Sequence, residues 1–153
     1  MWADPIDNAT INDFCLLYDS FAKSIGINNA NKEKMIAYRD GNNLAFTKAI
    51  DGNGRVICMH ALIFDDSRAR LLYSYSVFRG LDKNTRDISG RANKSLHWFD
   101  IIQFKKRSLK CYDFGGISLK GETENIDKFK MAFGGEVITE YNTICLDFFW
   151  WAK

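Results

Sequence analysis

The sequence predicts an α/β protein of the α+β kind, with helices flanking a mixed, mostly antiparallel sheet. Apolar residues recur at helical spacing in the first forty residues, which predicts two helices before any strand. Three alternating segments separated by turn residues follow and predict a three-stranded meander. Farther on, a helical pattern precedes a short run of strand formers that ends in two glycines.

Length and charge limit the possible functions. With 153 residues, the chain is expected to be a single domain over residues 1–153, large enough to bury a core. A net charge of +2 is too small to indicate nucleic-acid binding. A single proline and 26% charged residues, spread along the chain, speak against disorder.

The cysteines and the apolar runs predict where the protein works. The four cysteines are far apart in the sequence and no histidine is placed to complete a zinc site, so we expect no metal and a reducing compartment. No apolar run reaches membrane-spanning length, and the first residues lack the pattern of a signal peptide. We therefore expect a cytoplasmic protein without a membrane span.

The first two helices are predicted over residues 8–25 and 29–40. In the first, apolar residues such as Ile11, Phe14 and Tyr18 share one face, Asn8 or Thr10 would cap the start, and Gly26 would end it. The second is weaker and stops at Gly41.

The meander is predicted from strands at residues 43–51, 55–64 and 69–78. The residues between the first two strands, 51–54, read DGNG, which is a strong hairpin turn. Tyr73 and Tyr75 would point to the same face of the third strand because side chains alternate along a strand.

The second half of the chain has a helix, a strand and a further helix. A helix is predicted over residues 87–106 with Ile88, Leu96 and Ile102 on its apolar face. A strand at 110–114, a helix at 126–133 that stops at two glycines, and a strand or hairpin at 137–147 follow.

Three segments of the second half resemble a known family. Residues 112–116 (YDFGG), 129–135 (FKMAFGG) and 90–98 (GRANKSLHW) resemble the C-terminal signature of the FemA/FemB/FemX-like transferases, which are built from acetyltransferase-type (GNAT) domains. The element order matches a GNAT domain except for its first strand, which is weak or missing in residues 1–8. The resemblance implies transfer of an acyl or aminoacyl group to an amine, commonly on a glycan or cell-envelope precursor.

The resemblance also implies a donor site. In a GNAT fold, the third meander strand and the strand at 110–114 splay apart, and acyl-CoA would lie between them against backbone groups near Val77 and Phe78. The loop at 83–89 would meet the pyrophosphate at a helix N-terminus. The phosphate-binding residues would be Arg86, Ser89, Gly90 and Arg91. Asp87 stands where the family has a basic or amide residue, and the alternative is a plain helix start capped by Asp87.

Two residues are candidate catalytic groups. Asp113 lies within a strand expected to be central, where a carboxylate needs a partner or a cleft, so it is either a general base or the acceptor in an Asx-type turn to the glycines. Lys130 aligns with the general-acid tyrosine of acetyltransferases, and would protonate the leaving group or stabilise an oxyanion. The alternative for Lys130 is a lysine that extends to solvent.

The acceptor would meet side chains near the proposed slot. Arg70, Tyr73 and Tyr75 would contact it if their strand face lines the pocket, and would otherwise be core and rim. His97 and Trp98 could stack on a sugar or base, or simply pack. His60 has no partner at a spacing that would indicate a nucleophilic triad.

The functional hypothesis is acyl or aminoacyl transfer to a small-molecule or glycan-precursor amine, without metal. The donor would be acyl-CoA or aminoacyl-tRNA, with tRNA as donor only. The alternatives are an ordinary acetyl-CoA-dependent N-acetyltransferase and a non-catalytic GNAT-like binding domain. The apolar end, residues 148–151, and an exposed sheet edge also favour a homodimer.

Overall fold

The computed structural model describes residues 6–77, 82–117 and 124–141. The chain divides into two compact units, Met1–Gly115 and Gly116–Lys153, and each is described by itself. The expectation of one domain over the whole chain stays a prediction. Within the described residues, no helix is both long enough and apolar enough to cross a membrane.

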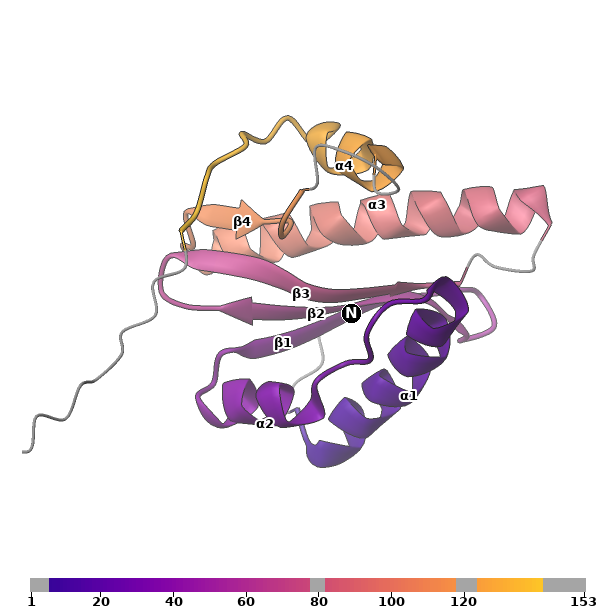
Figure 1. Ribbon diagram of the computed structural model, residues 1–153, viewed down its shortest axis with the longest axis horizontal. Coiled ribbons are helices and arrows are strands. Elements are labelled where there is room, and N and C mark those ends of the chain that lie inside the picture. The colour runs from indigo at the N-terminus through magenta and orange to yellow at the C-terminus, as the bar shows by residue number, and fades with distance from the viewer. Residues whose placement is uncertain (1–5, 78–81, 118–123, 142–153) are drawn as a thin grey trace, which may run out of the picture. The chain divides into compact units, whose positions relative to one another are not determined.

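The first unit is a four-stranded sheet with helices on both faces (Figure 1). Its strands stand in the order β1-β2-β3-β4; the first three pair antiparallel and β4 is parallel to β3. In chain order the elements are α1 (Asn8–Ile25), α2 (Lys32–Asp40), β1 (Leu44–Ile50), β2 (Val56–Phe64), β3 (Arg68–Ser76), α3 (Lys83–Lys106) and β4 (Cys111–Asp113). The predicted fold class, with two helices before a meander, is confirmed.

The two N-terminal helices begin at side-chain caps. α1 has the predicted bounds, but its cap is Asp7, whose carboxylate accepts the backbone N–H of Thr10 at 2.7 Å. α2 starts three residues later than predicted because Asn31 caps it, accepting the N–H of Lys34 at 2.8 Å. Each cap satisfies an amide that the first helical turn leaves unpaired.

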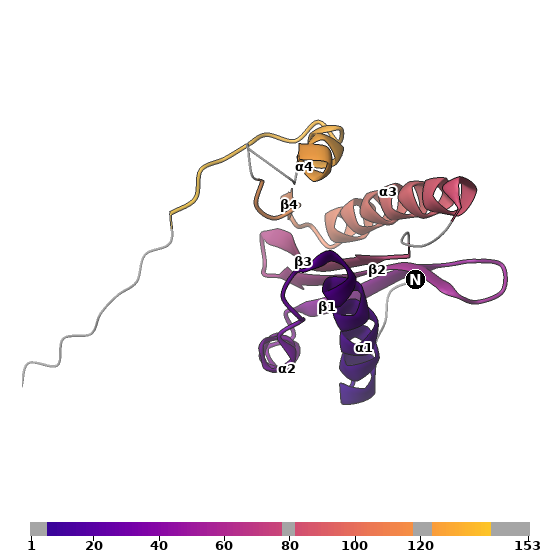
Figure 2. The same cartoon turned by 45° about the vertical axis from the view of Figure 1, so that its right-hand side comes forward.

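One face of the sheet carries the apolar core. α1 and α2 cover it, as both ribbon views show (Figures 1 and 2). Aromatic rings dominate: Phe14 lies 5.0 Å from Phe46 and 5.7 Å from Tyr18 between ring centroids. The buried members of this cluster come from both helices and from the strands: Ile11, Phe14, Tyr18, Ala22, Met35, Leu44, Phe46, Met59 and Ala61.

The opposite face is covered by α3, and the side of this helix that packs on the sheet differs from the prediction. Its buried residues are Ser89, Leu96, His97, Asp100 and Phe104. Ile88 and Ile102, expected in the core, are 39% and 47% exposed. The prediction was right for Leu96 and wrong for Ile88 and Ile102, because it did not foresee that the polar His97 and Asp100 would be buried with hydrogen-bond partners.

The second unit contains α4 (Glu124–Met131), which begins and ends two residues before the predicted range of 126–133. Gly134 follows it with φ +76°, consistent with the predicted stop at two glycines. The strand predicted at 137–147 is not seen in its described part, 137–141, which has no regular structure and is exposed. Residues 142–153, with the apolar end at 148–151, and residues 1–5, with most of the weak first strand, lie outside the described residues.

Candidate active site

The parallel strands β3 and β4 stay together over only three residue pairs. Arg68 pairs with Cys111, Ala69 with Tyr112, and Arg70 with Asp113, after which β4 ends while β3 continues to Ser76. Beyond Arg70, therefore, no residue of β4 pairs with the backbone of β3. We call this half-strand of residues 71–76, which has no partner in β4, the open edge of β3.

A bulge and a glycine mark the point where the strands separate. Ala61 of β2 stands opposite Tyr73 and Leu62 opposite Leu71, so Leu72 is an extra residue in β3. Such a bulge bends its strand. Across from it, Gly115 has φ +79°, and a Cβ there would lie 3.6 Å from the carbonyl oxygen of Leu71. A glycine at this position lets the chain leave β4 in a left-handed turn close to β3.

Asp113 has the contacts of a structural carboxylate. It forms ion pairs with Arg68 and, at 3.4 Å, with Arg70, and it accepts the Gly115 N–H at 2.7 Å in an Asx-type turn. Burial opposes its ionisation, but the Arg68 hydrogen bond, the Gly115 amide and Arg70 together outweigh burial and hold the pKa of Asp113 below its usual value. A carboxylate with a lowered pKa is a weak base, so this geometry favours the turn over general-base catalysis.

The predicted phosphate-binding segment lies inside a helix. α3 starts four residues before the expected Asp87, because the side chain of Asp82 caps it by accepting the N–H of Thr85 at 3.1 Å. The amide of Arg86 is already bonded to the Asp82 carbonyl, and Ser89 is buried toward the sheet. Gly90 and Arg91 lie one turn farther along the helix and are exposed, as is the Arg86 side chain. Because the Thr85 amide is bonded to the Asp82 cap, the first-turn amides that an anion could reach are those of Lys83 and Asn84.

The other predicted donor contacts were at the end of β3. The Val77 N–H is bonded to the carbonyl of Ile57 at 2.9 Å, so this amide points to β2 rather than to the open edge. Phe78 lies outside the described residues.

Tyr73 and Tyr75 share one strand face, as predicted, and that face packs on α1. The Tyr73 ring lies 4.9 Å from that of Tyr18, and its hydroxyl accepts the Asn31 N–H at 3.0 Å. Tyr75 meets Phe21 edge to face at 5.9 Å. Their contacts are those of core residues, while Arg70 beside them is 43% exposed along its side chain.

His97 and Trp98 are neighbours in sequence but differ in exposure. Trp98 is 48% exposed, whereas His97 is only 2% exposed and its ring lies tilted against that of Phe114, with the centroids 5.0 Å apart. The His97 side chain therefore lies beneath α3 and not on an open surface. There it joins a polar cluster that sequence reasoning missed.

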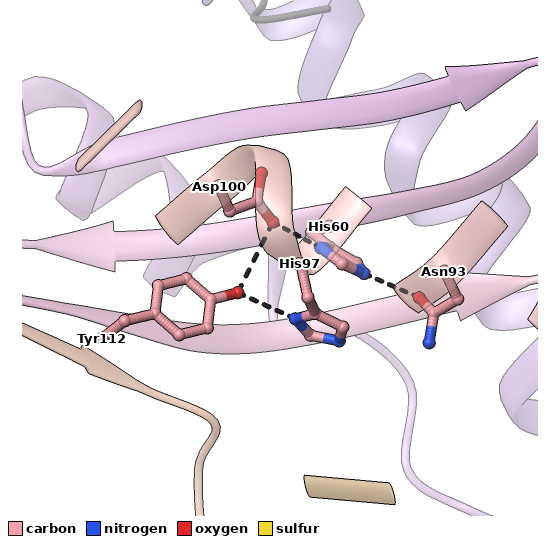
Figure 3. A network of polar contacts seen from close by, with 5 residues as sticks. All are labelled: His60, Asn93, His97, Asp100 and Tyr112. Atoms are coloured by element: carbon pink, nitrogen blue, oxygen red, sulfur yellow. Dashed lines mark hydrogen bonds and ion pairs between the residues drawn. The ribbon is translucent and has the colours of Figure 1, made fainter. Parts of the chain in front are cut away.

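Five residues form this polar cluster (Figure 3). His60 of β2 bonds through Nδ1 to the Asp100 carboxylate at 2.6 Å and through Nε2 to the Asn93 amide oxygen at 2.8 Å. Tyr112 of β4 joins His97 to this group: its hydroxyl lies 2.9 Å from His97 Nδ1 and donates to Asp100 at 3.4 Å. The cluster thus links β2, α3 and β4.

Burial changes the titration of the groups around this cluster. It raises the pKa of the Tyr112 hydroxyl well above the usual value, and the Asp100 charge raises it further. It also raises the pKa of the Cys58 thiol, on the same strand as His60, to about 12, with Asp100 again contributing in that direction. Both groups therefore keep their protons at neutral pH.

Lys130 belongs to the second unit. Its ammonium donates to the Gly116 carbonyl at 2.5 Å, and its neighbours Phe129 and Phe133 pack edge to face at 5.3 Å. The hydrogen bond to Gly116 fixes the position of the Lys130 ammonium. A catalytic ammonium needs such a fixed position. Its pairing with Asp113 across a slot stays a prediction.

A cavity of about 440 Å³ lies between α1 and the β1 edge of the sheet, away from β4 in the strand order. Thr10, Asp13, Leu16, Thr47 and Lys48 are among its lining residues. None of the site residues predicted from the sequence lines it.

Comparisons with known proteins identify the fold. No family model and no curated protein matches the sequence. Among solved structures, a probable acetyltransferase is similar with a TM-score of 0.65 at 10% identity, over 97% of this chain and 96% of that chain. An aminoglycoside acetyltransferase from an uncultured soil metagenomic sample, in complex with sisomicin, gives a TM-score of 0.61 at 11% identity, over 92% and 93%.

A ribosomal-protein-alanine N-acetyltransferase from Brucella melitensis biovar Abortus 2308 is similar as well, with a TM-score of 0.55 at 11% identity over 94% of this chain and 95% of that chain. The chain therefore has the fold of the GNAT acetyltransferases. At these identities, the likeness concerns the fold alone.

Proposed function

We propose that this chain, which has the GNAT acetyltransferase fold, transfers an acyl group from acyl-CoA to an amine. The observation that carries the proposal is the early separation of β3 and β4, with a bulge at Leu72 and the turn at Gly115. This leaves the open edge of β3 without a strand partner in β4, as a site for the amide-bearing arm of a donor. The acetyltransferase structures that share the fold support the same chemistry.

The residues present fit such a donor. The open edge of β3 supplies backbone groups, and the first turn of α3 supplies amides and the positive end of a helix dipole for the phosphates. Arg86 and Arg91 are exposed near that end, and guanidinium groups bind phosphate in a bidentate manner. Within this proposal, Arg86 and Arg91 hold the phosphates, and Ser89 and Gly90 shape the helix that carries them.

The reaction is a direct attack of the acceptor amine on the thioester carbonyl. The new C–N bond forms, the C–S bond breaks, the amine loses one proton and the leaving thiolate gains one. In this proposal, Lys130 provides the ammonium that donates to the developing negative charge. Asp113 holds Arg68 and Arg70 at the end of β4, so that Arg70 can meet an anionic or hydroxylated acceptor.

The aminoacyl-tRNA donor and the glycan or cell-envelope acceptor are the finer form of the hypothesis, and they rest on the Fem-like motifs at 112–116 and 129–135. Arg70 on β3 and Trp98 on α3 are both partly exposed. A guanidinium and an indole that solvent can reach could contact a polar small molecule that carries the amine. A homodimer also remains part of the proposal, to be checked by the mass in solution.

The test is binding of acetyl-CoA, measured by calorimetry and by thermal stabilisation. We expect wild-type protein to bind, and Arg86→Glu to weaken binding about tenfold, equivalent to about 1.4 kcal/mol. The matched control is Lys106→Glu, the same reversal at the other end of α3, which should leave the affinity unchanged.

Each outcome separates the alternatives. Equal loss from both reversals would indicate a general charge effect and count against the phosphate site. Stabilisation by aminoacyl-tRNA with none by acetyl-CoA would favour the aminoacyl donor. If neither donor binds, the chain is the non-catalytic binding domain that the sequence left open.

A further inference from the structure

We propose that His60, His97 and Asp100 form a binding site for a divalent transition metal ion, of which Zn²⁺ is the probe. One potential ligand atom from each side chain lies within 4.8 Å of the others. The three side chains are 0%, 2% and 0% exposed. Two imidazoles and a carboxylate are a ligand set that suits zinc and its neighbours in the first transition row.

The elements that carry these residues bring them together rigidly. His97 and Asp100 are three residues apart on α3, so they project from the same side of the helix. His60 comes from the middle of β2, directly beneath that helix (Figure 3). Sites built on helices and strands hold their ligands more firmly than sites on loops.

The burial of the Asp100 carboxylate is a second observation that supports a metal ion. Its carboxylate is fully buried, and Oδ1 has no hydrogen-bond partner. Oδ2 meets His60 and Tyr112, and within the described residues no lysine or arginine forms an ion pair with Asp100. A buried carboxylate needs a positive charge beside it. A metal ion supplies that charge and binds the carboxylate whose Oδ1 is otherwise unbonded, which with the two imidazoles makes three protein ligands.

The outer contacts of the histidines fit the same assignment. Metal-bound imidazoles usually donate their second N–H to an oxygen, which fixes the ring. His60 directs Nε2 to the Asn93 amide oxygen at 2.8 Å, leaving Nδ1 toward Asp100. His97 is fixed in a similar way by the Tyr112 hydroxyl at 2.9 Å.

The ion takes the place of a proton. His60 Nδ1 and Asp100 Oδ2 are 2.6 Å apart and share a hydrogen. Tetrahedral bonds of about 2.1 Å place two ligand atoms about 3.4 Å apart, so binding widens this pair and releases the proton. The rival arrangement keeps the proton and forms an imidazolium–carboxylate pair, with His97 as a packing residue.

The experiment measures metal in the whole protein, expressed with a tag that contains no histidines. A Cys111→Ser background removes the thiol of Cys111, which is exposed and could otherwise bind zinc. We expect about one Zn²⁺ per chain after purification or after addition to chelator-treated protein, together with a higher melting temperature. Mg²⁺ should produce no shift because it prefers oxygen ligands. X-ray absorption at the zinc edge should show only nitrogen and oxygen neighbours.

Variants locate the ion. Asp100→Asn and His97→Gln keep the approximate size of each side chain, and each should lose the bound metal and the thermal shift. Cys58→Ala is the matched control, since Cys58 is equally buried on the strand that carries His60 and its sulfur is not among the ligand atoms. It should retain the metal.

The zinc content and the thermal shift of the wild-type protein test the proposed metal site even if the variants fail to fold. Less than a tenth of an equivalent of metal and no shift with Zn²⁺ would overturn the proposal and leave the proton-bridged pair. A sulfur neighbour in the absorption spectrum, or loss of metal in Cys58→Ala with retention in Asp100→Asn, would overturn it as well. None of these measurements depends on the proposed acyl transfer.

Discussion

The two faces of the sheet are built on different principles. The face beneath α1 and α2 is filled with apolar side chains, many of them aromatic. On the face beneath α3, the apolar cluster is small, with Ala45, Leu62, Ala69 and Phe104 as its buried members. In the part of the chain that the structure describes, the buried polar side chains lie on α3 or on the strand positions that face it: Thr47, His60, Ser89, His97 and Asp100.

This difference suggests separate roles: the apolar face stabilises the fold, and the polar face holds a functional group of side chains. Burial of apolar area stabilises in proportion to that area, without needing a partner of fixed geometry. A buried polar group gains little net stability even when its hydrogen bonds are complete. The polar cluster is therefore a costly way to fill a core, and its presence is better explained by a ligand or by the position it gives to β4.

The largest effect is expected on the apolar face. Phe14→Ala should lower the free energy of unfolding by about 4 kcal/mol, because the ring is fully buried against Phe46, Tyr18 and Tyr73. Urea denaturation followed by circular dichroism would measure it. A loss below about 1 kcal/mol would mean that this face does not carry the fold.

An intermediate effect is expected from breaking the polar cluster. In chelator-treated protein, His60→Leu should cost about 3 kcal/mol, because it leaves the Asp100 carboxylate buried without its main partner. The double variant His60→Leu with Asp100→Leu should regain most of that loss, since apolar residues of similar size replace the pair.

The double-mutant cycle makes the comparison quantitative. The free-energy losses of His60→Leu and Asp100→Leu are compared with the loss of the double variant. If the loss of the double variant equals the sum of the two single losses, His60 and Asp100 contribute independently to stability, as apolar core residues do. The two faces would then not differ in the way described above.

The smallest effect is expected on the outer side of α3. Ile102→Ala should change the free energy of unfolding by no more than about 0.5 kcal/mol, because this side chain is 47% exposed. Leu96→Ala on the same helix is the matched control, and should cost about 3 kcal/mol since Leu96 is 4% exposed. Equal losses in the same denaturation assay would show that the side of α3 is assigned wrongly.

Local patterns in the sequence were enough to predict most of the fold. α1 was predicted over its observed bounds, and the turn at 51–54 closes a hairpin as predicted. These features depend on neighbours within a few residues, which a sequence displays directly. The start of α3 was missed because Asp82 caps it, and the prediction read the polar residues that follow as a loop.

The polar cluster could not be predicted in the same way. His60 and Asp100 are forty residues apart, and only the packing of α3 on β2 reveals their hydrogen bond. One signal was present: His97 and Asp100 stand three residues apart in a helical segment, the spacing of a polar pair on one side. The apolar pattern of Ile88 and Ile102 hid it, because periodicity alone cannot show whether a polar residue will find a buried partner.

The three-residue contact between β3 and β4 has a consequence for folding. β1, β2 and β3 follow one another along the chain, whereas β4 reaches β3 only after the 24 residues of α3 are in place. Contacts between distant segments form late and, when few, open first. The seam at Arg68, Ala69 and Arg70 should thus be the first part of the sheet to exchange its amide hydrogens with water, and a ligand seated beside it would slow that exchange most.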